Sequence, residues 1–194
     1  MATLLHIAAS PRAEASHSRR ATQEPISERQ GHESALTVVL CYLAAEPVPH
    51  PTACFADTSL TAPPKRNDAQ RAVLAPSETL TNELDAADVV LAFTPTHNFT
   101  ASLLKSRINH VVRRHRTYRS TVNGEIGLLR GRPVRVLIAC GRALGSAPPP
   151  REDLATPYLR YVLETIRLKD VPVIALENCN RRAPGGKPRD RHEH

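Results

Sequence analysis

Five short apolar runs divide the chain and alternate with segments of helical pattern. Runs of this length, rich in Val, Ile and Leu and bounded by proline or polar turns, predict strands buried on both faces of a parallel sheet. Strands that alternate with helices form a three-layer α/β domain. We expect a five-stranded parallel sheet, with no internal repeat and no second domain. The runs are Thr3–Ala9, Ala35–Tyr42, Asp88–Phe93, Pro133–Ala139 and Val171–Leu176.

Two of the intervening segments have a clear helical pattern. In Thr100–Arg116 apolar residues recur every three or four positions, which predicts an amphipathic helix with basic residues on its other faces. Thr156 and Pro157 predict the start of the second helix, because a hydroxyl caps free N–H groups and proline fits the first turn. The apolar stripes are Leu104, Ile108, Val111 and His115 in the first helix and Tyr158, Leu159, Val162, Leu163 and Ile166 in the second.

Other segments are interrupted or lack a pattern. Asn67–Ala87 is helical in pattern, but Pro76 predicts two shorter helices or a sharp kink, with Ser77 capping the second helix. Arg19–Gln30 also contains a proline, and we expect a short or kinked helix there. Residues 46 to about 64 have no periodicity and predict a long surface loop.

Composition limits the class of protein. The chain has 194 residues, of which 41% are hydrophobic, enough for the core of one domain. It contains no apolar run of the roughly 20 residues that span a bilayer, and its N-terminus lacks the layout of a signal peptide. We therefore expect a cytoplasmic protein that binds no membrane. Four cysteines lie far apart without a Cys-x-x-Cys pair, which argues against a disulfide framework or a metal site.

The net charge of +7 is concentrated in two places. Residues 105–119 contain six basic residues and no acidic one, and residues 181–193 add a net charge of +3. Such clusters attract phosphates, but the chain has no nucleic-acid motif and few aromatic residues that could stack on bases, so we do not expect nucleic acid as a partner. Arg113, Arg114 and Arg116 are expected on a solvated face; the alternative is a dimer rim or the mouth of an anionic substrate site.

The end of the chain carries no periodic pattern. Beyond Asn178 the residues are mainly Arg, Gly, Pro and His. This composition predicts one folded domain over residues 1–178 and a basic, disordered tail over residues 179–194.

Polar loops follow three of the predicted strands. They are Ser10–Ser18, Thr96–Phe99 and Cys140–Gly145. In an open α/β sheet, ligands bind in the crevice at the carboxyl ends of the strands. The first loop places serine hydroxyls beside a helix start, a combination that binds phosphate but lacks the glycines and lysine of a P-loop. The alternative is plain capping by Ser16 and Ser18.

Five motifs occur in a fixed order along residues 3–177. Together this order resembles the family of FMN-dependent NADH:quinone and azobenzene reductases. The motifs are Ser-Pro-Arg-x-x-x-Ser-x-Ser at 10–18, Pro-x-x-Asn-Phe at 95–99, Leu-Lys-x-x-x-Asn at 104–109, Asn-Gly-x-x-Gly-Leu-x-x-Gly at 123–131 and Asp-Leu-x-Thr-Pro-Tyr-Leu at 153–159.

The resemblance implies a three-layer flavodoxin-like fold over residues 1–178 and a homodimer with FMN in each crevice at the dimer boundary. It also implies residue roles, carried over by position. The phosphate would be held by Ser10, Ser16, His17 and Ser18, the isoalloxazine would be lined by Thr96, His97, Asn98 and Phe99, and the ring site would be completed by Cys140, Gly141, Arg142 and Ala143.

The implied activity is a ping-pong oxidoreductase reaction. A hydride passes from NADH or NADPH to the flavin, and a small quinone-like or azo aromatic substrate then takes the electrons. Two residues are candidates for catalytic roles: Tyr118 as an aromatic lid on the partner's pocket, and His97 as a proton donor because it titrates near neutrality. For His97 the alternative is a solvated loop histidine. Cys140 is either a reactive thiol or a passive small residue.

The chain departs from the family pattern in these same loops. Thr96 and His97 stand where the family has Met-Tyr, and Arg142 and Ala143 stand where it has glycines. The basic tail replaces a long final helix. These differences leave two alternatives open: a repurposed homodimer that performs a non-redox or flavin-independent step of a biosynthetic pathway in the same crevice, and a scaffold protein without FMN.

Overall fold

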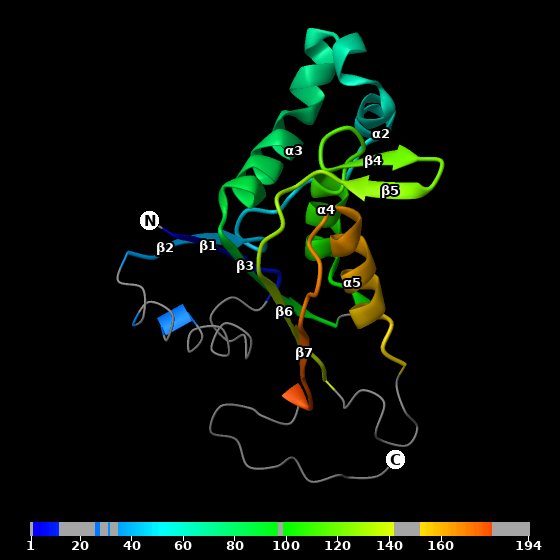
Figure 1. Ribbon diagram of the computed structural model, residues 1–194. Helices are drawn as coiled ribbons and strands as arrows, with labels where there is room; N and C mark the ends of the chain where they lie inside the picture. The colour runs from blue at the N-terminus through cyan, green and yellow to red at the C-terminus, as the bar shows by residue number, and fades with distance from the viewer. Residues whose placement is uncertain are drawn as a thin grey trace.

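The computed structural model describes residues 2–11, 26–27, 31, 35–96, 99–141 and 152–179. Within them, five parallel strands form one sheet in the order β2-β1-β3-β6-β7, as expected for a flavodoxin-like α/β fold (Figure 1). Most of the helix expected at 19–30 and residues 180–194 of the predicted tail lie outside the described residues. The strands are β1 (Thr3–Ala8), β2 (Thr37–Tyr42), β3 (Val89–Pro95), β6 (Val134–Ala139) and β7 (Val173–Leu176).

The strand order changes direction at β1. The chain passes from β1 outward to β2, and then returns to the other side of β1 to form β3, β6 and β7 in turn. The N–H of Ala9 donates to the carbonyl of Phe93 over 2.9 Å, which holds the carboxyl ends of β1 and β3 side by side. A ligand crevice forms where the strand order reverses, so this fold places it after β1 and β3.

Both faces of the central strands are buried, as the apolar runs predicted. Leu5, Val90 and Val136 belong to the main core, and Leu4, Leu91 and Phe93 belong to a second cluster. This alternation follows from the period of two in a strand. Figure 1 shows three helices together on one side of the sheet, where they cover the main core. They are α3 (Asp68–Ala86), α4 (Ser102–Val111) and α5 (Ala155–Thr165).

Pro76 lies inside α3, which runs as one helix from Asp68 to Ala86. The prediction of two shorter helices was therefore wrong. Ser77 is not a cap: it is buried, and its hydroxyl donates to the carbonyl of His110 over 2.5 Å. The helix begins instead with a capping box, in which Asn67 and Gln70 each accept a backbone hydrogen bond from the other. Tertiary packing along the whole helix outweighs the local cost of the proline.

The expected surface loop over residues 46–64 contains helix α2 (Ala53–Leu60) and the short 3-10 helix η2 (Pro63–Lys65). The side chain of Thr52 caps α2 by accepting from the N–H of Phe55 over 3.2 Å. Phe55 is buried against the imidazole of His110, with ring centroids 4.5 Å apart. The loop prediction failed because α2 is only 8 residues long and buries only two of them, too few to give a periodic pattern.

A hairpin follows α4 and consists of β4 (Tyr118–Thr121) and β5 (Gly124–Gly127). The sequence did not predict it, because the segment is polar. Since α4 starts after the carboxyl end of β3 and β6 starts after the hairpin, the hairpin lies at the amino edge of the sheet. Figure 1 shows it beside α5, and a Cβ on Gly127 would lie 2.3 Å from the backbone nitrogen of Arg167.

Because of this close approach, Gly127→Ala should lower the free energy of unfolding by about 1–3 kcal/mol through overpacking. Gly131→Ala is the matched control, since a Cβ on Gly131 would lie 3.9 Å from the nearest atom, the carbonyl oxygen of Arg167. Urea unfolding followed by circular dichroism measures both variants. Equal unfolding midpoints for the two would contradict the tight contact between the hairpin and the chain after α5.

Candidate active site at the carboxyl edge of the sheet

The structure brings the first residues of the three predicted loops to one edge. β1, β3 and β6 are neighbours in the sheet, so Ser10, Thr96 and Cys140, which follow them directly, lie at the same edge. The N–H of Thr96 donates to the carbonyl of Ala139 over 2.9 Å, and its hydroxyl donates to the same oxygen over 3.3 Å. The carboxyl ends of β3 and β6 are therefore fixed to each other. The predicted site residues outside the described part of the chain are Ser16, His17, Ser18, His97, Asn98, Arg142 and Ala143.

Ser10 and Phe99 provide a hydroxyl and an exposed aromatic side chain at this edge. Ser10 is buried immediately after β1, which places a hydroxyl at the point where the strand order reverses. Phe99 is 43% exposed and has a φ of 75°, a value that a bulky residue rarely adopts. Its N–H donates to the carbonyl of Thr96 over 3.2 Å, which ties Phe99 to the end of β3. Such strained, exposed residues cluster at ligand sites.

Cys140 is a buried side chain of the main core. Burial raises the pKa of its thiol, so little thiolate forms near neutral pH. Of the two alternatives for Cys140, the structure therefore supports the passive small residue. Gly141 comes next in the chain, and a glycine permits close approach of a ligand to the backbone.

The described edge fits FMN. A phosphate suits the hydroxyl of Ser10, and a flat ring suits the exposed aromatic side chain of Phe99 and a glycine at position 141. Among the residues that the structure describes, no group of three or more His, Cys, Asp or Glu could hold a metal ion. Within the same residues, no helix has the length and apolar character needed to cross a membrane.

Tyr118 does not belong to this edge in its own chain. It begins β4 at the amino edge of the sheet, whereas Ser10 and Thr96 lie at the carboxyl edge. Its side chain is half-buried and packs against the main core. A contact between Tyr118 and the crevice therefore requires a second copy of the chain.

The basic residues after α4 are not all solvated. Arg113 is buried, and its guanidinium contacts the carboxylate of Glu78 and the hydroxyl of Ser77. Arg116 is half-buried and donates to Glu78 over 2.9 Å. The prediction of a solvated face was therefore wrong for Arg113 and Arg116, and correct for Arg114, which is exposed.

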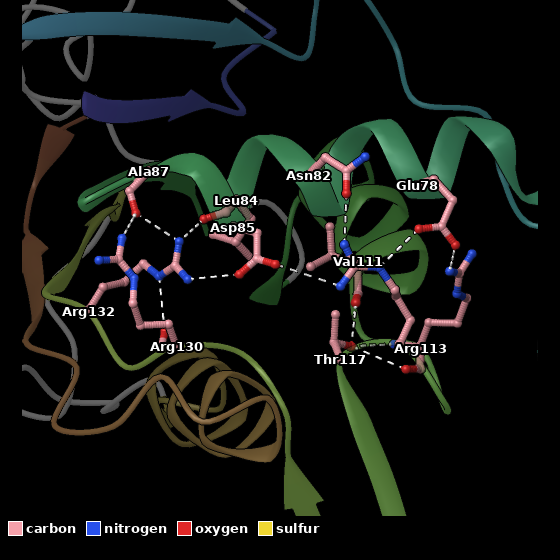
Figure 2. A network of polar contacts seen from close by, with 11 residues as sticks. Glu78, Asn82, Leu84, Asp85, Ala87, Val111, Arg113, Thr117, Arg130 and Arg132 are labelled. Atoms are coloured by element: carbon pink, nitrogen blue, oxygen red, sulfur yellow. Dashed lines mark hydrogen bonds and ion pairs between the residues drawn. The ribbon is translucent and has the colours of Figure 1, made fainter. Parts of the chain in front are cut away.

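The acidic partners of these arginines all come from α3 and were not predicted from the sequence. Glu78 and Asp85 are seven residues apart and so lie on one face of the helix. Figure 2 shows Glu78 facing Arg113 and Asp85 facing Arg132, with Asn82 between the two carboxylates. One feature of the sequence could have indicated these partners: residues 105–119 contain several arginines and no acidic residue. Any of these arginines that is buried must pair with a carboxylate from another segment.

The contact with arginine changes the ionisation of Glu78. Burial opposes its ionisation, but the hydrogen bonds and positive charges of Arg113 and Arg116 outweigh burial and hold its pKa below the usual value. A lowered pKa stabilises the fold at neutral pH, and this contribution is lost as the pH falls through the folded-state value.

Wild-type protein should therefore exceed Glu78→Gln in stability at pH 7, and the difference should shrink as the pH falls below about 4.3, the usual carboxyl pKa. Urea unfolding between pH 3 and pH 7 measures the difference. Asp68→Asn is the control, because it breaks an exposed ion pair with Arg71 on the same helix and should cost little at any pH. If the difference in stability between wild type and Glu78→Gln stayed constant down to pH 3, it would contradict the lowered pKa of Glu78.

Thiol labelling tests the burial of Cys140. Cys54 is exposed, whereas Cys41 is half-buried and Cys140 is buried, and burial raises the pKa of both of these thiols. Iodoacetamide at pH 8 should modify Cys54 first and Cys140 only after unfolding, as read by mass spectrometry of peptides. Equal rates for Cys54 and Cys140 in the folded protein would show that Cys140 is reactive.

Comparisons with known proteins agree with this geometry. A family model described as a flavodoxin-like fold matches residues 2–194. FMN-dependent NADH:quinone oxidoreductase 2 of Cupriavidus pinatubonensis is 46% identical over 182 residues, which cover 93% of this chain and 88% of the relative. The FMN-dependent NADH:quinone oxidoreductase of Herminiimonas arsenicoxydans is 36% identical over 186 residues, which cover 95% of this chain and 91% of that relative.

A solved structure shares the fold. The azoreductase of Bacillus anthracis superposes with a TM-score of 0.80 at 20% identity, over 93% of this chain and 88% of that one. This chain is 46% and 36% identical to the two oxidoreductases over most of their length, which identifies the family more narrowly than the shared fold does. This chain belongs to the FMN-dependent NADH:quinone oxidoreductase family and has a flavodoxin-like fold.

Proposed function

We propose that this protein is a cytoplasmic FMN-dependent NADH:quinone oxidoreductase that reduces quinone-like and azo aromatic compounds. The observation that carries the proposal is the 46% identity to a quinone oxidoreductase over nearly the whole chain. It is supported by the reversal of the strand order at β1, which is where ligands bind in open α/β sheets, and by the positions of Ser10 and Phe99 at that edge.

Bound FMN supplies the redox chemistry, because its ring can take a hydride from NADH and give two electrons to a quinone. The protein binds and orients the cofactor. Ser10, Ser16, His17 and Ser18 would hold the phosphate. The turn from Thr96 to Phe99 sets the position of the ring, and Asn98 bonds its polar edge. His97 donates a proton to the reduced product.

One crevice serves both substrates in turn. The nicotinamide and the quinone are both flat, and each must reach the same ring at the edge bordered by Thr96, Phe99 and Gly141. The oxidised nicotinamide therefore leaves before the quinone enters, which is a ping-pong sequence. NADH is the donor in the names of the relatives, and we propose it here with NADPH as the alternative.

The functional unit that we propose is a homodimer. A single chain cannot bring Tyr118 to its own crevice, but a second copy can. Several apolar side chains of the hairpin and of α5 are exposed, and the proposed second copy would cover them. They are Val122 at the hairpin tip, Ile126 in β5, Leu128 just after it and Tyr161 in α5.

The absorption spectrum of the purified protein tests the redox function. We expect a flavin spectrum that NADH bleaches and a quinone restores, because the cofactor cycles between its oxidised and reduced forms. Protein that stays colourless after addition of FMN would contradict the proposal and favour the flavin-independent alternative.

Two variants test the site assignment. Asn98→Ala should raise the Kd for FMN by about tenfold, equivalent to about 1.4 kcal/mol, because one hydrogen bond to the ring is lost. Arg114→Ala removes an exposed charge at the other end of α4 and should change the Kd less than about twofold. Quenching of flavin fluorescence on binding gives both constants. Equal affinities would contradict the proposed ring site.

A further inference from the structure

A pocket with a wholly apolar lining lies inside the main core, between the sheet and helices α4 and α5. Its volume is about 60 Å³, and its lining exposes only apolar atoms. The strand residues that line it, such as Val90, Ala92 and Val136, belong to the main core on the helix-covered face of the sheet. The pocket is therefore separate from the edge proposed for FMN, which is bordered by the loops that follow β1, β3 and β6.

Ala92 leaves the gap on the sheet side of the pocket. It is paired in register with Ile7 of β1 and Val136 of β6, so the three side chains lie in a row on one face. Ala92 is the smallest residue that lines the pocket, and both of its neighbours carry branched side chains. An alanine between two branched residues leaves space above its methyl group, which only the facing helices could fill.

The helices close over this space without filling it. α4 contributes Leu104 and Ile108, and α5 contributes Leu159 and Leu163; each pair is four residues apart and so shares one face of its helix. All lining residues are buried except Leu163 and Val112, which are half-buried. Solvent therefore reaches the lining only at these two residues, which is where a small molecule would enter.

Arg107 also lines the pocket but adds no polar group to it. Its guanidinium donates to the thiol of Cys41 over 2.9 Å and to the carboxylate of Glu83 over 3.0 Å. Only the aliphatic part of the side chain faces the pocket, as is usual for a long side chain whose charged end is held elsewhere. A water molecule in the pocket would find none of the roughly two to four polar partners that a buried water needs.

The size of the pocket limits its ligand. A water molecule in the liquid takes about 30 Å³, and an engineered apolar cavity of about 150 Å³ accepts benzene or xenon. With about 60 Å³, this pocket is too small for an aromatic ring but large enough for a xenon atom or a diatomic gas. Dispersion contacts stabilise such a ligand, because the atoms that line an empty pocket lack contact partners on one side.

We propose that this pocket is a binding site for one small, neutral and apolar molecule of the size of xenon or dioxygen. Dioxygen is a molecule of this kind that a cell supplies, and xenon serves as the experimental probe. The site does not depend on FMN or on the proposed oxidoreductase activity, because it arises from the packing of β3 against α4 and α5.

Paramagnetic relaxation by dissolved dioxygen tests the location of the site. NMR spectra of the full chain with isotope-labelled methyl groups are recorded under nitrogen and under oxygen pressure. The methyl groups of Leu104 and Ile108 should relax severalfold faster under oxygen, because the paramagnetic gas occupies the pocket beside them. Leu4 and Leu137 are the controls and should respond much less, since they are similarly buried but belong to the second cluster on the other face of the sheet.

A substitution at Ala92 tests the origin of the pocket. Ala92→Val places methyl groups in the gap, so the chemical-shift changes that xenon causes at Leu104 and Ile108 should disappear. Ala175→Val is the matched control, because Ala175 also lies in a strand but is exposed and does not line the pocket. This variant should bind xenon as the wild type does. Urea unfolding shows whether both variants are folded.

Two results would overturn the site. Equal relaxation by oxygen at Leu104 and at Leu137 would show that the gas does not occupy the pocket. Xenon-induced shifts that persist in folded Ala92→Val would show that the gap above Ala92 does not hold the ligand. If Ala92→Val does not fold, the comparison of methyl groups in the wild-type protein decides the matter by itself.

Discussion

The contact between buried arginines and the carboxylates of α3 is the constraint on which the amino edge of this molecule depends. Arg113 and Arg132 have side chains that are almost fully buried, and neither has an acidic partner nearby in sequence. Glu78 and Asp85 supply the missing charges from α3. Because an unpaired buried guanidinium is costly, this requirement fixes the position of the segment between β3 and β6 relative to α3.

We propose separate roles for the two edges of the sheet. The carboxyl edge, where β1 and β3 diverge, has the buried hydroxyl of Ser10 and the exposed ring of Phe99, which suit a phosphorylated flavin. The amino edge has a hairpin with apolar, exposed residues and a firmly held base. The homodimer is our proposal, and a two-fold axis would allow the amino edge of one copy to face the carboxyl edge of the other.

The site residues were predictable to different degrees. Ser10, Thr96 and Cys140 could be placed at one edge from the sequence, because each follows an apolar run and parallel strands end together. The sequence could not show that the Cys140 thiol is unreactive, because the pKa of a thiol depends on its burial. The sequence also could not show that Arg113 pairs with Glu78, because the two residues are 35 positions apart and no local periodicity connects them.

The sequence by itself determined the five strands, the presence of α4 and α5 and the family, because hydrophobic period and ordered motifs are local properties of the chain. The ends of the two helices differ from the prediction: α4 ends at Val111 rather than near Arg116, and α5 begins at Ala155 without a cap from Thr156. Tertiary structure decided that α3 continues through Pro76, that α2 forms in a segment without periodicity, and that the basic stretch after α4 is partly buried. In each case contacts between distant segments outweighed a local preference of roughly 1 to 3 kcal/mol, and such contacts exist only once the chain has folded.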